Sequence, residues 1–294
     1  MKKTVFRGAA SALVTPFRDG EMDLCALGEL IEFQIASGID ALVIAGTTGE
    51  GSTLSPKERE RLFAFSVERV AKRVPLICGT GSNDTKTAIK YTKIAQRVGA
   101  DATLSVTPYY NKGTERGIIE HYKRIIDETE LPTILYNVPS RTGVNLSLSA
   151  IEELSELPNI VGIKEASDSL DRLTSLSILT DKLALYSGND SQIYPTLALG
   201  GMGVISVASN IMPRTLSELT RRYFEGNTAG ALELQKRLLP FISLLFSETN
   251  PSPIKYAMSL LGYCKSEPRL PLTEPAPLTK QKIKEALDMY RDLL

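Results

Sequence analysis

The sequence has little of the chemistry on which many enzymes depend. It contains one histidine, His121, and its three cysteines, Cys25, Cys78 and Cys264, lie far apart with no Cys-x-x-Cys pair. This composition argues against a histidine-based catalytic triad and against a metal site built from several histidines or cysteines. The scattered cysteines also argue against a disulfide framework and favour a reducing compartment.

Charge of one sign and long apolar runs are also missing. The 294 residues include 34 Lys plus Arg and 34 Asp plus Glu, so no net charge favours nucleic acid or an anionic membrane as a partner. No apolar segment approaches the roughly 20 residues of a membrane span. The start, Met1-Lys2-Lys3, resembles that of a signal peptide, but Arg7 and Pro16 interrupt any apolar core after it. We therefore expect a cytoplasmic protein.

Eight short, largely apolar segments recur along the first two thirds of the chain. Helical patterns separate them at spacings of roughly 20–35 residues, about the length of a strand-plus-helix unit. Eight such units predict a closed (β/α)8 barrel of the TIM type. The alternative is an open doubly wound sheet, which usually carries Gly-x-Gly-x-x-Gly after its first strand; Thr15-Pro16-Phe17 stands there instead. The expected strands cover residues 10–14, 41–45, 76–79, 102–106, 133–136, 160–164, 183–186 and 203–207.

The end of the chain follows a different pattern. The alternation of strands and helices stops near Tyr223, and helical patterns alone follow over residues 229–245, 253–261 and 279–294. These helices are too apolar to stand alone in water. We therefore expect a catalytic barrel over residues 1–224 and a C-terminal helical extension, residues 225–294, packed against it.

One lysine stands inside an otherwise apolar strand. The segment from Val161 to Ala166 indicates a strand of a parallel sheet that is buried on both faces. Period-two alternation places Lys164 between Gly162 and Ala166 on one face, with Val161 on the opposite face. An amine removed from water favours its neutral form and can attack a carbonyl carbon to give a Schiff base. The alternative is a strand-end lysine that reaches solvent.

Other polar residues follow the ends of the expected strands, where the active site of such a barrel lies. Thr47 and Thr48 stand between glycines after the second strand, where N–H and hydroxyl groups can converge on a small anion. Tyr110 follows the fourth strand, Tyr136 ends the fifth, and Arg141 can hold a carboxylate with its two-pronged fork. Together they predict a site for a 2-oxo acid that uses no metal or cofactor. Tyrosine and threonine would relay protons in place of histidine.

Glycines surround the last two expected strands. Gly188 follows the seventh strand, and Gly200-Gly201-Met202-Gly203 borders the eighth. Loops of this kind hold phosphate in many barrels. They serve equally well as packing turns, and the sequence leaves both interpretations open.

Three segments carry a resemblance to a known family: Gly46-Thr47-Thr48-Gly49-Glu50, Tyr136-Asn137-Val138-Pro139-Ser140-Arg141-Thr142-Gly143 and Gly162-Ile163-Lys164-Glu165-Ala166. They resemble the signatures of the dihydrodipicolinate synthase / N-acetylneuraminate lyase family. Lys164 lies 164 − 136 = 28 residues after Tyr136, as the family pattern requires. The likeness runs nearly end to end and is greatest to the synthase branch, since sialate lyases typically lack the counterpart of Arg141.

The resemblance implies condensation of pyruvate with aspartate 4-semialdehyde, a step toward diaminopimelate and lysine, without a cofactor or metal. It implies that Lys164 forms the Schiff base with pyruvate and that Tyr136 moves protons at that carbon. Thr47 would link Tyr136 to a Tyr110 that reaches in from a neighbouring subunit of a homotetramer, a dimer of dimers. The implied binding groups are Thr48 for the pyruvate carboxylate, Arg141 for the semialdehyde carboxylate, and the main chain at Gly188 and Ile205.

Several positions depart from the family pattern. The sequence has Gly51-Ser52 where Ser-Ala is common, and Pro56, Arg59 and Thr87 stand where lysine-inhibited members carry histidines and an acid. We therefore expect weak or absent inhibition by lysine. Two alternatives remain at this stage: a related pyruvate-dependent aldolase that splits a sialic acid or a 2-keto-3-deoxy sugar acid, and a barrel that only binds a keto acid.

Overall fold

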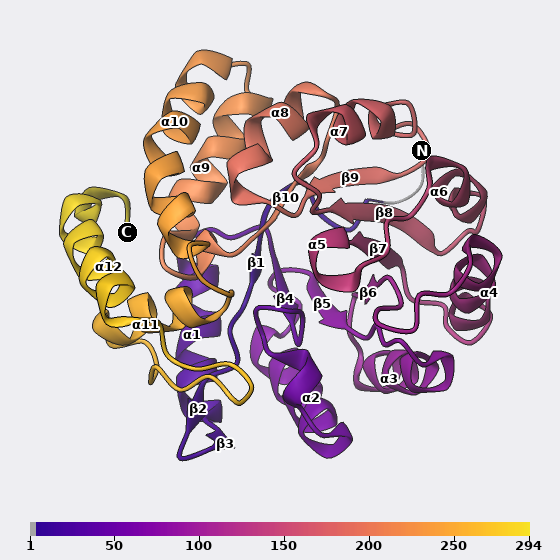
Figure 1. Cartoon of the computed structure of the whole chain (residues 1–294), viewed down its shortest axis with the longest axis horizontal. Coiled ribbons are helices and arrows are strands. Elements are labelled where there is room, and N and C mark those ends of the chain that lie inside the picture. The colour runs from indigo at the N-terminus through magenta and orange to yellow at the C-terminus, as the bar shows by residue number, and fades with distance from the viewer. Residues whose placement is uncertain (1–3) are drawn as a thin grey trace.

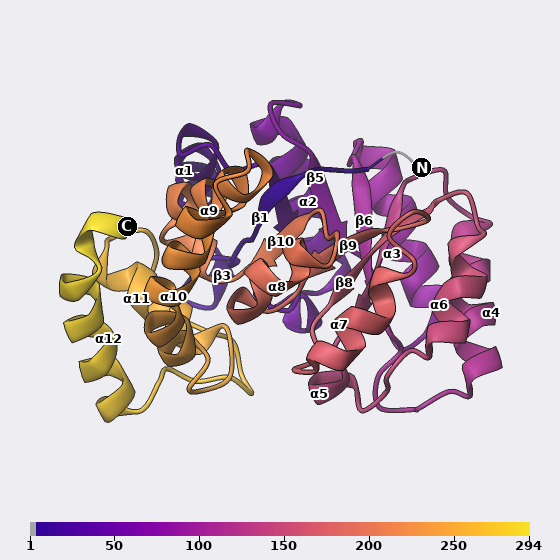
Figure 2. The same ribbon diagram turned by 90° about the horizontal axis from the view of Figure 1, so that it is seen from above.

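A computed structural model describes residues 4–294, so the basic start at Met1-Lys2-Lys3 lies outside the described residues. Eight parallel strands close into a barrel in the order β1-β10-β9-β8-β7-β6-β5-β4, because β1 pairs with both β10 and β4 (Figures 1 and 2). The predicted (β/α)8 barrel is confirmed, and the open sheet is excluded. The barrel strands are β1 (Gly8–Ala12), β4 (Ala41–Ile44), β5 (Leu76–Gly79), β6 (Ala102–Val106), β7 (Thr133–Asn137), β8 (Ile160–Glu165), β9 (Ala184–Ser187) and β10 (Gly203–Ser206).

Helices separate the strands and surround the barrel (Figure 1). Local sequence sets their ends: Ser55 and Glu58 form a complete capping box at the start of α2, and Gly99 ends α3 with a left-handed φ of 90°. A short antiparallel pair, β2 (Phe17–Arg18) with β3 (Glu21–Met22), was not foreseen. The helices of the barrel are α1 (Leu24–Ala36), α2 (Pro56–Val70), α3 (Thr85–Val98), α4 (Glu115–Ile126), α5 (Pro139–Thr142), α6 (Leu148–Ser155), α7 (Leu170–Ser177), α8 (Ile193–Ala198) and α9 (Pro213–Phe224), with 3-10 turns η1 (Gly51–Thr53), η2 (Asp190–Gln192) and η3 (Ala208–Asn210).

The barrel interior contains one departure from simple alternation. The register between β7 and β8 shifts at Thr133/Ile134, so that Ile134 faces Gly162 rather than the residue before it. Val161 is the extra residue of this bulge and packs in the same buried cluster as Ile134 and Ala184. The expectation that Val161 lies on the face opposite Lys164 is therefore wrong.

The glycines near β10 serve packing. Gly200 and Gly201 come before the strand, at the end of the barrel away from the carboxyl ends of the strands. A Cβ on Gly201 would lie 2.6 Å from Thr196 Cγ2, and one on Gly203 would lie 1.8 Å from the Gly8 carbonyl oxygen. Close approach of backbones at the β1–β10 seam requires glycine here. The packing interpretation holds for this loop, and the phosphate interpretation does not.

Three helices follow the barrel, as the sequence predicts: α10 (Thr228–Leu245), α11 (Ser252–Leu260) and α12 (Pro277–Met289), with a last 3-10 turn η4 (Arg291–Leu293). They lie together on the side of the barrel that carries α1 and α9 (Figures 1 and 2). Leu238 and Ile283 of these helices are fully buried in one cluster with Leu27 of α1 and Leu216 of α9. The extension thus shares a buried apolar core with these helices of the barrel.

Candidate active site

Lys164 lies inside the barrel near the carboxyl end of β8. The residue is only 5% exposed, and its Nζ lies 4.6 Å from the centroid of the Tyr136 ring on β7. Space beside the lysine stem is limited, because a Cβ added to Gly188 would come within 3.0 Å of Lys164 Cε. Burial excludes the alternative of a lysine that reaches solvent.

A buried carboxylate holds the two strands that carry Lys164 and Tyr136. Glu165 points to the outer face of β8, where it is fully buried and accepts a hydrogen bond from Asn137 Nδ2 of β7 at 2.9 Å. It also accepts from the Ser167 N–H at 2.9 Å and from Arg172 Nε at 3.4 Å. Because this carboxylate has its own donors, it fixes the geometry of the strands without pairing with Lys164.

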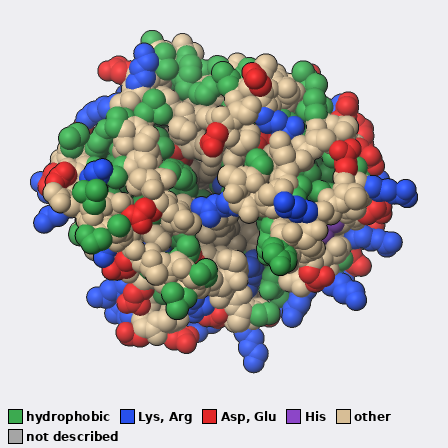
Figure 3. All heavy atoms as spheres, viewed as in Figure 1, with side chains coloured by type: hydrophobic (Ala, Val, Ile, Leu, Met, Phe, Trp, Pro, Cys, Tyr) green, Lys and Arg blue, Asp and Glu red, His purple; other side chains and the backbone are tan. Residues whose placement is uncertain are grey.

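The amine of Lys164 opens onto a cavity of about 360 Å³ at the mouth of the barrel. The face of the molecule seen in Figure 3 is hollowed near its centre, and a basic side chain lies at the edge of the hollow. A cavity of this size suits a small ligand. Six of the eight expected site residues line it: Lys164, Tyr136, Thr47, Thr48, Arg141 and Gly188.

The loop after β4 turns sharply and brings both threonines to the cavity. Ala45 and Glu50 each have a left-handed backbone, with φ of 50°. Thr48 is 3% exposed, and its Oγ1 accepts a hydrogen bond from Asn250 Nδ2 at 3.0 Å. The Thr48 hydroxyl can therefore direct its own hydrogen into the cavity, toward an anionic group.

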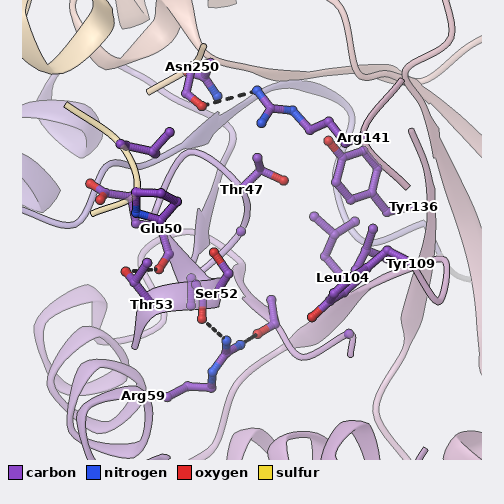
Figure 4. A pocket seen from close by; sticks show the side chains of 18 residues that line it. Thr47, Glu50, Ser52, Thr53, Arg59, Leu104, Tyr109, Tyr136, Arg141 and Asn250 are labelled. Carbon is purple, nitrogen blue, oxygen red and sulfur yellow. Dashed lines mark hydrogen bonds between the residues drawn. The ribbon is translucent and has the colours of Figure 1, made fainter. Parts of the chain in front are cut away.

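Arg141 stands at the rim of the cavity on α5, where its side chain is exposed. Its Nη2 donates to the backbone oxygen of Asn250 at 3.2 Å (Figure 4). A guanidinium carries five N–H donors, more than this contact uses. The fixed fork can therefore hold a carboxylate at the entrance to the lysine site.

A second cavity, of about 240 Å³, lies beside the first and shares Thr47 and Tyr136 with it (Figure 4). Arg59 lines this cavity and is 5% exposed. Its guanidinium donates to the carbonyl oxygens of Gly79, at 2.5 Å, and of Gly51. Burial lowers the pKa of Arg59 from its ordinary value. A cation is thus built into the wall of this cavity at position 59, one of the positions that depart from the expected family pattern.

Two of the expected site residues lie elsewhere in this chain. Tyr110 is 88% exposed, has a φ of 72°, and does not line either cavity. Ile205 is fully buried inside the barrel, and Val207, two residues later, lines the larger cavity. A role for Tyr110 in the site therefore depends on a second copy of the chain.

Two further residues that the sequence analysis did not assign to the site line the larger cavity. Asp190 Oδ2 accepts the N–H groups of Val207 and Ala208 at 3.0 and 2.8 Å, while burial raises the pKa of this carboxyl. Its place directly after β9 was a signal that could have identified it. Asn250 comes from the extension, and only its tertiary contacts reveal its place in the site.

Among residues 4–294, no group of three or more His, Cys, Asp or Glu is arranged to hold a metal ion. None of the helices in that range is long and apolar enough to cross a membrane.

The model of the dihydrodipicolinate synthetase family matches residues 5–290. The chain belongs to this family. A 4-hydroxy-tetrahydrodipicolinate synthase of Alkaliphilus oremlandii is 47% identical over 284 residues, covering 96% of this chain and 98% of the relative. The crystal structure of the dihydrodipicolinate synthase from Aquifex aeolicus matches this family member with a TM-score of 0.96 and 46% identity, covering 98% of this chain and 99% of the other. The chloride-inhibited dihydrodipicolinate synthase from Acinetobacter baumannii, solved in complex with pyruvate, gives a TM-score of 0.95 and 41% identity, covering 99% and 100% of the two chains.

Proposed function

We propose that the chain catalyses the reaction of 4-hydroxy-tetrahydrodipicolinate synthase, the condensation of pyruvate with L-aspartate 4-semialdehyde. The observation that carries this proposal is the buried amine of Lys164, which opens onto a cavity shared with Tyr136, Thr48 and Arg141. Membership of the family and a relative named 4-hydroxy-tetrahydrodipicolinate synthase, 47% identical to this chain, support it.

The covalent steps follow from the nucleophile. The neutral amine of Lys164 adds to C2 of pyruvate, and loss of water leaves an imine. Loss of a methyl proton gives an enamine, whose carbon attacks the aldehyde carbon of the semialdehyde while the aldehyde oxygen takes up a proton. The amino group of the semialdehyde then attacks C2, closes the ring and releases Lys164.

Protons and carboxylates need protein groups in this scheme. The Tyr136 ring centroid lies 4.6 Å from the lysine amine and the side chain lines the same cavity, so its hydroxyl is suited to protonate the departing oxygen on C2 and to accept a proton from the methyl group. Thr48 is suited to the pyruvate carboxylate beside the lysine, and Arg141 at the rim to the carboxylate of the second substrate. Two acidic substrates are thus accommodated without a cofactor.

Reductive trapping tests this function. Borohydride added with pyruvate should fix a pyruvyl group on the peptide that contains Lys164, as mass spectrometry would show. Lys164→Met should abolish both the adduct and turnover, whereas the control Lys182→Met, which changes a half-exposed lysine on the outer surface, should retain both. An adduct on another lysine, or turnover in Lys164→Met, would refute the proposal.

A substrate panel separates the related activity. Turnover of the semialdehyde but of no sialic acid or 2-keto-3-deoxy sugar acid supports the synthase, while the reverse identifies a sugar-acid aldolase. A barrel that only binds a keto acid would give no adduct at all.

We also propose that the chain forms a homotetramer, a dimer of dimers, in which Tyr110 enters the site of a neighbour. Its 88% exposure leaves a large aromatic ring free to do so, and the smaller cavity beside Thr47 and Tyr136 offers a place for it. Analytical ultracentrifugation tests the assembly, and inactive Tyr110→Phe and Lys164→Met chains that regain activity when mixed would support an exchange of Tyr110 between subunits. The unpaired cysteines support a cytoplasmic location, which fractionation of the source cells can test.

A further inference from the structure

A buried ion pair joins the loop that carries Thr47 and Thr48 to the helical extension. Lys255 Nζ of α11 donates to Glu50 Oε1 at 2.6 Å, and both side chains are completely shielded from solvent. The other oxygen of Glu50 accepts the N–H of Arg269 at 2.7 Å. Both oxygens of this loop carboxylate are therefore bound by the extension, more than 200 residues further along the chain.

The loop that carries Thr47 and Thr48 has an unfavourable backbone conformation, which contacts from outside the loop must stabilise. Glu50 has φ of 50° and ψ of 37°, a left-handed conformation that is unfavourable for a residue with a side chain. Its N–H donates to the Thr47 carbonyl oxygen at 3.1 Å, so the placement of Glu50 and of Thr47 are coupled. A displacement of Glu50 would therefore move the threonines relative to Lys164.

A second contact joins the same two segments. Asn250, five residues before Lys255, donates from Nδ2 to Thr48 Oγ1 at 3.0 Å and accepts from Arg141 with its backbone oxygen at 3.2 Å. One short segment of the extension thus touches both residues assigned to substrate carboxylates. The ion pair at Lys255 fixes the start of α11, directly after this segment.

Stability alone is a weak reason for such a pair. Two charges removed from water lose hydration that their attraction often fails to restore, and apolar residues of similar size can serve as well. Lys255 Nζ has two further contacts: it donates a hydrogen bond to the Glu267 carbonyl oxygen at 2.9 Å, and it lies 4.4 Å from the centroid of the Phe17 ring. Fixing one arrangement of two segments is a better-attested role for a buried ion pair than raising stability.

We propose that Glu50 and Lys255 are positioning residues for the pyruvate site, holding the Thr47–Thr48 loop and the Asn250 segment in the one arrangement that binds the pyruvate carboxylate. The inference rests on the proposed function, because it takes Lys164 as the residue that pyruvate modifies. It extends the site to the C-terminal extension, which stabilises the loop from outside the barrel.

The double variant Glu50→Gln/Lys255→Met separates positioning from stability. It removes both charges with little change in volume, so it avoids the isolated buried charge that either single variant would create. Positioning predicts that the pyruvate concentration for half-maximal borohydride trapping rises at least tenfold, even where the melting temperature falls no further than in a variant that only creates a core cavity. KM for pyruvate should rise in parallel.

Leu238→Ala is the matched control. Leu238 is fully buried in α10 of the extension and lies outside both cavities, so its truncation lowers the melting temperature through a core cavity. Its half-maximal pyruvate concentration should remain native. If the double variant traps pyruvate with the native concentration dependence, the positioning role is wrong while the function stands. If the native chain traps no pyruvate, the proposed function itself fails.

Discussion

Replacing Tyr136 with phenylalanine isolates the proposed proton transfer. The change removes one oxygen and keeps the ring that lies 4.6 Å from Lys164 Nζ. The backbone role of residue 136 is also kept, because its carbonyl oxygen accepts from the Thr107 N–H at 2.9 Å and from Thr107 Oγ1 at 3.0 Å. The variant should therefore fold normally and lose only the acid–base step.

The expected loss follows from that step alone. General acid–base catalysis contributes about 10²–10⁴ in rate, which at 1.36 kcal/mol per tenfold corresponds to roughly 3–5 kcal/mol of activation free energy. Coupled assays of Tyr136→Phe should show turnover lower by that factor. Borohydride should still fix pyruvate on Lys164, because the nucleophile remains, although more slowly.

Tyr122→Phe provides the comparison. Tyr122 is fully buried, and its hydroxyl donates to the Ser105 carbonyl oxygen at 3.2 Å, outside the cavities. Its loss should reduce the free energy of unfolding by about 1 kcal/mol and leave turnover nearly unchanged. Turnover of Tyr136→Phe within tenfold of the native rate would show that another group moves the proton.

Three further outcomes are expected. Gly188→Ala places a Cβ 2.5 Å from the Ala166 Cβ and 3.0 Å from Lys164 Cε. The displaced lysine amine should lower activity about 10²-fold in kinetic assays, while the free energy of unfolding should fall by only about 1–3 kcal/mol. Native kinetics would contradict this expectation. Lysine should not inhibit initial rates at sub-millimolar concentration. The Arg59 guanidinium already occupies carbonyl acceptors in the smaller cavity and would repel the ammonium groups of a lysine ligand. Strong inhibition at these lysine concentrations would overturn the expectation. Burial lowers the pKa of His121 to about 4 from 6.5, so the unfolded chain binds this proton first as the pH falls, and the free energy of unfolding should drop by about 2 kcal/mol from pH 7 to pH 5. The single imidazole NMR signal tests that value, and a midpoint near 6.5 would refute it.

Local pattern was enough to predict the barrel and a buried lysine inside it. Short, largely apolar runs mark all eight strands, because strands of a parallel barrel are buried on both faces. Alternation also placed Lys164 correctly with Gly162 and Ala166, since the β8 ladder is regular from Gly162 onward. It failed at Val161, where an inserted residue in the ladder turns one more side chain inward, and nothing in the local sequence marks a bulge.

The residues that local pattern missed are those whose partners are distant in the chain. Asn250 contacts Thr48 across 202 residues, and Lys255 contacts Glu50 across 205. The local sequence around each residue does not indicate its contact partner, so only the packing of the extension on the barrel reveals the pairing. The same limit applies more strongly to Tyr110, because the site that it is proposed to enter belongs to a second copy of the chain.

The residues predicted from local pattern and the residues that depend on distant contacts also differ in their proposed chemical roles. Lys164 and Tyr136, which would carry out bond formation and proton transfer, stand on adjacent strands whose spacing the barrel itself determines. Thr48 and Arg141, which would select the substrates by their carboxylates, are both bonded to Asn250 of the extension. In the proposed mechanism, Schiff-base chemistry would therefore depend on the barrel, and the choice of substrate would depend on how the extension contacts the loops. Changes at Asn250 should consequently alter substrate affinity before they alter imine formation, the opposite of what changes in β7 and β8 should do.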